Sequence, residues 1–273
     1  MPEGDTIFRT ATVLRRALLG GVVRRASAQP GPGLSRVPDL SVLAGSTVEE
    51  VQSRGKHLLI GFSGGRWLRT HMRMKGSWHR YRPGEAWRLP TRRAVCVLET
   101  DTAVAVCFDA PVVELLTDAE LARHDALRAL GPDLLGESPD LDEAVVRLRE
   151  HERIELGEAL LDQRVAAGIG NAIKSEALFM ERLDPWAPVS DFSDDELRSV
   201  MRRAADLLAA NTGGGRRVTT GRRSPGEAAW VYRRAARPCR RCGTLIRSRR
   251  QGVQARTTYW CPSCQPARAD PRT

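Results

Sequence analysis

The sequence predicts an α+β protein of several domains: an N-terminal β-sandwich with one flanking helix, an α-helical region and a C-terminal zinc ribbon. Residues 22–115 contain short β-branched or alternating runs separated by Gly, Pro and charged turns, as strands do. From Asp118 onward, apolar residues recur at helical spacing. Two Cys-x2-Cys pairs follow near the C-terminus. We therefore expect domains at residues 1–130, 131–232 and 233–273.

The length and composition suit a globular protein with more than one core. The chain has 273 residues, of which 41% are hydrophobic, enough for two domains and a small appendage. No apolar run reaches the ~20 residues that a membrane span requires. Arg9, Arg15 and Arg16 interrupt any signal-peptide pattern in the first segment. We expect a cytoplasmic protein that does not bind a membrane.

Positive charge is concentrated near the C-terminus. The whole chain carries a net charge of +10, yet residues 211–273 alone hold 15 arginines, no lysine and two acids, a balance of +13. The first 210 residues are therefore slightly acidic, at −3. A basic quarter on a nearly neutral body indicates a polyanionic partner. A solvated basic tail is the alternative.

The chain begins with an expected amphipathic helix. Asp5-Thr6 is typical of an N-cap, and Gly20-Gly21 is typical of a helix stop. The apolar residues between them lie at helical spacing: Ile7, Ala11, Leu14 and Leu18.

Pro2, just before this helix, is the candidate nucleophile. A small residue at position 2 normally allows removal of the initiator methionine, which leaves a secondary amine on Pro2. An α-amino group titrates at roughly 8, and the positive end of a helix lowers its proton affinity. A secondary amine that attacks an aldehyde-like carbon forms an iminium directly. Glu3 is a candidate proton carrier beside it. The alternative is that Met-Pro is only a convenient start.

The β region contains two turns with candidate binding residues. Arg54-Gly55-Lys56 precedes a strand, where Gly allows a tight turn and Lys56 can project from it. The stretch 71–76 combines cationic side chains with slender apolar ones, which suits a loop that contacts phosphates and enters a base stack. A solvated lysine and an ordinary hairpin are the alternatives. We expect a loop at 29–38 and strands at 48–51, 57–62, 67–71, 95–98 and 104–108. Cys96 and Cys107 fall in these strands and are expected in the core.

The helical region contains a candidate phosphate site. The segment 166–170 is a short, glycine-containing joint between two helical patterns, so backbone N–H groups are exposed where the second helix starts. Asn171 adds its amide to this N-terminus. A helical hairpin without a ligand is the alternative. The basic, Gly-rich stretch 212–226 is expected to be a lid or strand-tracking loop. Helices are expected at 118–130, 142–151, 154–165, 171–182 and 193–211.

The cysteine spacing is the sharpest single motif. Cys239-x2-Cys242 and Cys261-x2-Cys264 are separated by eighteen residues, the pattern of a structural zinc site. Four thiolates close a tetrahedral shell, so one Zn²⁺ should hold structure and not catalyse. The intervening segment is arginine-rich and then alternates, which predicts a β-hairpin with a cationic tip.

With these motifs in this order, the chain resembles the formamidopyrimidine-DNA glycosylase/endonuclease VIII family of bacterial base-excision repair enzymes, nearly from end to end. Any one landmark is weak, whereas their joint order is very specific. The landmarks are Pro2-Glu3-Gly4, Arg54-Gly55-Lys56, the 71–76 loop, Gly168-Ile169-Gly170-Asn171 with Glu176 in a helix–two-turn–helix element, and the ribbon with Arg256 four residues before Trp260.

The resemblance implies a bifunctional DNA glycosylase and abasic-site lyase with four catalytic residues. Pro2 is similar to the nucleophile that attacks C1′ of the damaged nucleotide, expels the base and forms a Schiff base. Glu3 is similar to the acid that assists sugar-ring opening. Lys56 matches the lysine that engages a phosphate and assists β-elimination. Arg256 matches the ribbon arginine that holds phosphates beside the lesion and is linked to δ-elimination.

The resemblance also implies DNA contacts. His71 and Asn171 match phosphate contacts, Met74 matches the side chain that fills the space left by a flipped nucleotide, and Arg73 lies where endonuclease VIII-type proteins place another intercalating residue. The implied partner is DNA, duplex or single-stranded, with damaged bases or abasic sites. We expect a monomer associated with the bacterial nucleoid through DNA.

Two departures from the family's sequence pattern bear on the proton relay and on the substrate. Thr6 stands where family members usually have Glu, so a proton relay through that carboxylate is in doubt. Asp109 is followed by Ala110-Pro111 and not by the Arg-Arg-Phe cluster of the formamidopyrimidine branch. This favours an endonuclease VIII-like enzyme acting on oxidised pyrimidines. The alternatives are an 8-oxoguanine or formamidopyrimidine enzyme, and a damaged-DNA-binding protein without catalysis.

Overall fold

The computed structural model describes residues 2–31 and 36–268 and divides into two compact units, Met1–Arg128 and Ala129–Thr273. Each unit has its own hydrophobic core. Across the described residues, no helix is both long and apolar enough to cross a bilayer. The finer division into three domains stays a prediction.

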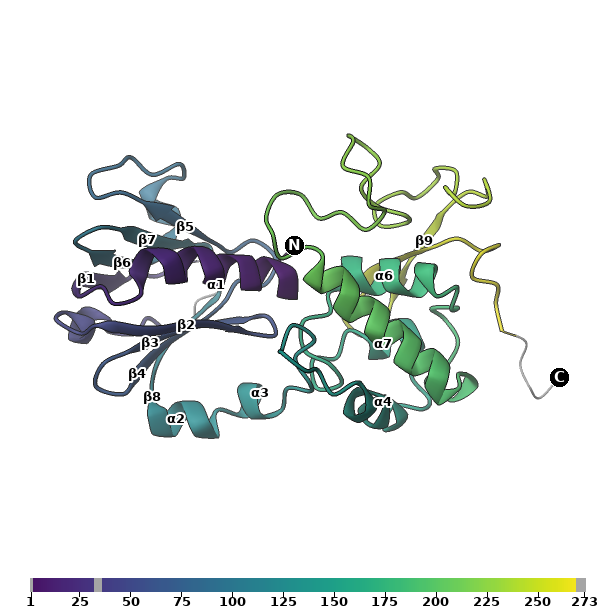
Figure 1. Cartoon of the computed structure of the whole chain (residues 1–273), viewed down its shortest axis with the longest axis horizontal. Helices are drawn as coiled ribbons and strands as arrows, with labels where there is room; N and C mark the ends of the chain where they lie inside the picture. Colours follow the sequence, from purple (N-terminus) through teal and green to yellow (C-terminus); the bar gives the residue numbers. More distant parts are fainter. Residues whose placement is uncertain (1, 32–35, 269–273) are drawn as a thin grey trace. The chain divides into compact units, whose positions relative to one another are not determined.

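The first unit contains the expected β-sandwich, built from two four-stranded antiparallel sheets (Figure 1). The turns η1 (Ser41–Leu43) and η2 (Thr91–Arg93) are short 3-10 helices. In spatial order, one sheet contains β1 (Val23–Ala28), β6 (Ala94–Thr100), β7 (Val104–Phe108) and β5 (Ser77–Tyr81), and the other contains β2 (Val48–Arg54), β3 (His57–Phe62), β4 (Arg66–His71) and β8 (Val112–Thr117).

The five predicted strand runs all lie within these strands. The sequence does not predict three further strands, β1, β5 and β8. Each contains partly exposed polar residues, which interrupt the apolar pattern by which strands are recognised. Cys96 and Cys107 lie opposite each other on β6 and β7 and are fully buried, and burial raises the pKa of both thiols. Both are free cysteines of the core, as predicted.

Helix α1 (Gly4–Leu18) packs along β2 and contributes its predicted apolar face to the sandwich core (Figure 1). The predicted cap is wrong: the N-cap is Glu3, whose backbone carbonyl accepts the N–H groups of Thr6 at 2.9 Å and Ile7 at 3.1 Å. Asp5 lies instead in the first turn, where a negative charge interacts favourably with the helix dipole. Its carboxylate accepts the Thr6 N–H at 2.7 Å. The helix ends before Gly20, whose φ of 76° is the left-handed conformation that glycine tolerates.

The single helix expected at 118–130 is two short helices, α2 (Asp118–Arg123) and α3 (Asp125–Arg128). Thr117 and Glu120 form a capping box at the start of α2. The helix ends because His124 adopts an extended conformation, and the His124 carbonyl then accepts the N–H groups of Leu127 and Arg128.

The second unit combines helices with a β-hairpin (Figure 1). The helix expected at 154–165 is wrong in length: only one turn forms, because the Asp162 carboxylate accepts the Arg164 N–H at 2.9 Å and turns the chain. The elements are α4 (Leu141–Arg149), α5 (Leu156–Ala159), α6 (Asn171–Met180), η3 (Val189–Asp191), α7 (Asp194–Ala209), β9 (Arg247–Gln251) and β10 (Arg256–Trp260).

Helices α4, α6 and α7 enclose the main core of this unit, and the hairpin packs on α6. Phe179 of α6 shares a smaller apolar cluster with Ile246 and Cys261 of the ribbon. Lys174 of α6 is fully buried, and its Nζ donates to the Thr258 hydroxyl at 2.6 Å. The ribbon is therefore joined to α6 by apolar packing and by a buried hydrogen bond.

Candidate active site and metal centre

Pro2 lies immediately before the N-cap of α1 and is half-buried. The neighbouring Glu3 and Asp5 are fully buried, although a buried carboxylate costs free energy unless its surroundings compensate. Thr6 occupies the position where the family usually has Glu. Asp5, one residue earlier, supplies a buried carboxylate in the first turn. The first unit thus places Pro2 and two acids at the positive end of one helix.

Lys56 occupies the two-residue turn between β2 and β3. Arg54 pairs with His57 across the hairpin, so Gly55 and Lys56 form the turn itself. Gly55 has a φ of 56°, which explains the glycine. The charge of Lys56 is one of those that lower the pKa of His71, at the end of β4.

The 71–76 loop separates its two methionines. Met72 is 2% exposed and belongs to the sandwich core, whereas Met74 is 51% exposed. The reversal between them occurs at Arg73, which has a positive φ of 44°. The sequence does not tell the two methionines apart, but the fold buries Met72 and exposes Met74.

His71 has a defined protonation state. Burial, followed by the charges of Lys56, Arg69 and Arg73, lowers the pKa of His71 to about 4. Its Nδ1 accepts the Arg73 N–H at 3.2 Å. The ring is therefore neutral near pH 7 and carries its proton on Nε2, which makes that atom a hydrogen-bond donor.

Asn171 is the first residue of α6 and is 6% exposed. Its Nδ2 donates to the Thr257 carbonyl at 2.7 Å, so the side chain holds strand β10 next to Arg256. This contact is not foreseen by the sequence, because the two residues are 86 positions apart. Gly168 has a φ of 107° in the joint before the helix.

Arg256 begins β10 directly after the hairpin turn and pairs with Gln251 of β9. Its Nε lies 3.4 Å from Gln254 Oε1. Gln251 is buried, and its amide donates to the Pro185 carbonyl at 2.7 Å. Gly252, in the turn, lies against the Glu158 side chain. The guanidinium is therefore carried by a hairpin that is fixed at both its strands and its tip.

Glu176 is a site residue whose role only the structure shows. It is fully buried in α6, and its carboxylate accepts the backbone N–H groups of Trp230, Val231 and Tyr232 at 2.7–2.8 Å. It also accepts the Thr219 hydroxyl. One carboxylate thus holds both ends of the segment 219–230, which contains part of the predicted lid.

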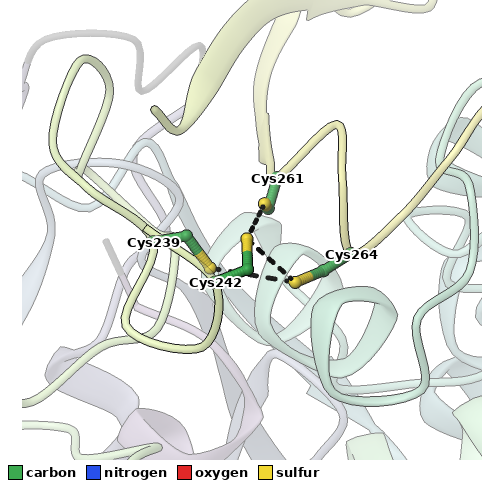
Figure 2. A group of neighbouring side chains, drawn as sticks. All are labelled: Cys239, Cys242, Cys261 and Cys264. Atoms are coloured by element: carbon green, nitrogen blue, oxygen red, sulfur yellow. Dashed lines mark hydrogen bonds between the residues drawn. The ribbon is translucent and has the colours of Figure 1, made fainter. Parts of the chain in front are cut away.

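The four ribbon cysteines converge on one point (Figure 2). Their sulfur atoms lie within 4.8 Å of one another, and Cys242 Sγ lies 3.5 Å from the sulfurs of both Cys261 and Cys264. Tetrahedral Zn²⁺ with Zn–S bonds of about 2.3 Å requires sulfurs about 3.8 Å apart. The Arg241 N–H also donates to Cys239 Sγ, which stabilises a thiolate. The cysteines fit a metal ion held by sulfur alone.

Two family models match the chain. The formamidopyrimidine-DNA glycosylase N-terminal domain matches residues 1–113, and the formamidopyrimidine-DNA glycosylase H2TH domain matches residues 130–220. A probable endonuclease 8 2 of Streptomyces coelicolor is 43% identical over 270 residues, which cover 97% of this chain and 94% of that protein. The chain belongs to the formamidopyrimidine-DNA glycosylase/endonuclease VIII family.

Other relatives agree with this membership. A DNA-(apurinic or apyrimidinic site) lyase Nei2 of Mycolicibacterium smegmatis is 43% identical and covers 98% of this chain and 100% of that protein. MutM (Fpg) of Thermus thermophilus has a TM-score of 0.79 at 28% identity, and the match covers 98% of this chain and 100% of that chain. Lactococcus lactis Fpg bound to N7-benzyl-Fapy-dG DNA has a TM-score of 0.81 at 21% identity. The match covers 97% of this chain and 100% of that chain, and it supports the fold alone. The endonuclease 8 relatives indicate the endonuclease VIII-like branch of the family.

Proposed function

We propose that this protein is a bifunctional DNA glycosylase and abasic-site lyase of base-excision repair, with a preference for oxidised pyrimidines. The observation that carries the proposal is Pro2 at the start of α1, beside the buried Glu3, in a chain of this glycosylase family. The endonuclease 8 relatives indicate the endonuclease VIII-like branch, and the absence of an Arg-Arg-Phe cluster after Asp109 favours oxidised pyrimidines over 8-oxoguanine.

Pro2 acts as the nucleophile. Its neutral amine attacks C1′ of the damaged nucleotide, and the bond between C1′ and the base breaks, so the base leaves with the bonding electrons and takes up the proton that the Pro2 nitrogen releases. Glu3 donates a proton to the sugar-ring oxygen, which opens the ring and leaves an iminium between C1′ and the Pro2 nitrogen. The iminium draws electrons from C2′ and acidifies its proton. Lys56 assists loss of that proton and departure of the 3′ phosphate, which cleaves the strand by β-elimination, and Arg256 supports δ-elimination of the 5′ phosphate.

The remaining predicted residues bind DNA. Met74 enters the space left by the flipped nucleotide, with Arg73 beside it, because an exposed flexible thioether suits a base stack. His71 donates from Nε2 to a phosphate. Asn171 and the α6 N-terminus contact another phosphate. The arginine-rich C-terminal quarter supplies the positive field that attracts DNA.

We further propose that the four cysteines hold one zinc ion. Soft thiolates and a shell of four sulfurs within 4.8 Å of one another favour Zn²⁺ in a structural role. The ion would fix the ribbon and hence the hairpin of Arg256. A monomer in the bacterial cytoplasm, associated with DNA, completes the proposal.

The substrate preference is tested with single-lesion duplexes. Duplexes with thymine glycol or dihydrouracil should be cleaved at least about tenfold faster than an otherwise identical 8-oxoguanine duplex. A site whose polar groups match an oxidised pyrimidine leaves some of them unpaired when it binds 8-oxoguanine, which costs a few kcal/mol. Initial rates of strand cleavage on a denaturing gel measure this. Faster cleavage of the 8-oxoguanine duplex would assign the chain to the other substrate class.

Replacing Arg256 should weaken DNA binding in a salt-dependent manner. Arg256→Ala should reduce the slope of log K against log salt by about 1, because one phosphate contact no longer releases a counterion. Arg198→Ala is the control, since Arg198 lies on α7 and pairs with Asp142 and Asp195. Titration of a fluorescent duplex at several salt concentrations gives both slopes. Equal slopes for Arg256→Ala and wild type would remove Arg256 from the interface.

A further inference from the structure

The outer face of the β2-β3-β4-β8 sheet carries a buried polar network. Side chains alternate between the two faces of a strand, and the core takes Leu58, Leu68 and Val113 from β3, β4 and β8. The residues next to these in sequence therefore lie on the other face, where α2 packs against β4 and β8. The outward-facing polar residues of β3, β4 and β8 include His57, Arg69, His71 and Glu114, of which His57 and Arg69 are buried.

Arg69 is the centre of this network. It lies opposite Glu114 on β8 and forms an ion pair with it through Nη1. Its Nη2 lies 3.0 Å from His57 Nδ1. His124, directly after α2, places Nε2 3.2 Å from the same Glu114 oxygen. The planar guanidinium thus contacts two partners with two different nitrogens, which a lysine cannot do.

The network ends at His71. His57 and His71 pair directly across β3 and β4, and their rings meet edge to face, 4.8 Å between centroids at 64°. An arginine can only donate, so His57 Nδ1 must accept and the proton of this neutral ring lies on Nε2. The orientation of His57 is therefore set by Arg69, and the His57 ring in turn limits the positions open to the His71 ring.

We propose that Arg69, held by Glu114, is a positioning residue that orients His71 through the His57 ring for contact with a DNA phosphate. The proposal rests on the DNA-binding role proposed for His71. A purely structural role, in which the ion pair only attaches α2 to the sheet, is the competing explanation. The two differ in what they predict for the His71 ring.

The surrounding charges support the same arrangement. His71 is faced by Lys56, His57, Arg69 and Arg73. Burial and then Arg69 lower the pKa of His57 to about 2, with smaller contributions from His71, His124 and Arg54. Both imidazoles are therefore neutral near pH 7, and removing the Arg69 charge should raise the pKa of His71 from about 4 towards its ordinary value.

The first test is NMR of the free protein. Nitrogen chemical shifts of the His71 ring, recorded between about pH 5.5 and pH 8, should show one neutral Nε2–H tautomer in wild type. In Arg69→Met, which keeps the length of the side chain, the His71 ring should lose its fixed orientation and populate both tautomers, and its pKa should rise because one of the charges that lower it is gone. Arg69→Lys keeps the cation but holds one partner at a time, so it should keep His71 neutral while mixing its tautomers. Unchanged His71 shifts in both folded variants would overturn the proposal.

The second test is a double-mutant cycle on a duplex with a tetrahydrofuran abasic-site analogue, which is not cleaved. Arg69→Met and His71→Ala should each weaken binding about tenfold or more, the size of one hydrogen bond to a charged phosphate, and the double variant should bind no more weakly than His71→Ala. Additive losses would mean that Arg69 acts independently of His71. Arg24→Met, which breaks the exposed Arg24–Asp101 pair of the other sheet, should leave binding unchanged.

The two tests separate this proposal from the proposed function. The NMR readout needs no DNA, so it decides the positioning of His71 even if the protein proves not to be a glycosylase. Conversely, covalent trapping of abasic-site DNA by wild type would support the glycosylase even if Arg69 and His71 proved independent.

Discussion

A protein with one alanine inserted before Pro2 should form no borohydride-trapped adduct with abasic-site DNA. The insertion turns the Pro2 nitrogen into an amide, which has no nucleophilic lone pair, and moves the new terminal amine by one residue. Release of a damaged base should fall by on the order of 10³-fold or more, as when a covalent nucleophile is removed from other enzymes. Adduct on a denaturing gel and rate of base release are the measurements.

Glu3→Gln is the matched control, because it keeps the terminal amine and removes only the acid. It should still be trapped on a preformed abasic site, whose sugar already has an open-chain aldehyde form and needs no acid to open the ring, while base release is lost. An adduct that forms at the wild-type rate in the alanine-extended protein would contradict the proposal. The nucleophile would then be sought among the three lysines of the chain, Lys56, Lys75 and Lys174.

Cys261→Ser should release the metal and unfold the ribbon. Cys261 is fully buried, and its sulfur is one of four that lie within 4.8 Å of one another. Structural zinc supplies much of the folding free energy of such small modules. Without the ribbon the Arg256 hairpin loses its support, so affinity for abasic-analogue DNA should fall by on the order of 10²-fold at moderate salt. Metal content by mass spectrometry and binding by fluorescence anisotropy measure the two effects.

The first unit should survive this change, because the sandwich core contains no ribbon residue. Calorimetry should therefore show one unfolding transition unchanged and another lost or shifted. Cys96→Ala is the matched control: it also removes a buried thiol, but one that lies in the sandwich, so zinc content and DNA affinity should stay as in wild type. Full metal content in Cys261→Ser would exclude a four-cysteine site.

Local chemistry was enough for much of the fold and for the choice of candidate residues. Strands with continuous apolar runs, such as β3 and β7, and the amphipathic faces of α1 and α7 are visible because burial imposes a period on consecutive residues. The cysteine pairs indicate a metal for the same reason, since ligand spacing is a local property. Strands with a solvent-facing side, such as β1 and β5, lack this apolar pattern and are therefore not predicted from the sequence.

The sequence by itself determined which groups are present, namely a proline at the start and a basic, cysteine-bearing C-terminal part, and it indicated a family that the matched family models confirm. Only the tertiary structure decided which groups act on one another. Arg69 meets Glu114 from 45 positions away, and Glu176 meets Trp230 from 54. Such contacts follow from strand pairing and helix packing, which bring distant residues together, and no period or local spacing in a single sequence encodes that distance.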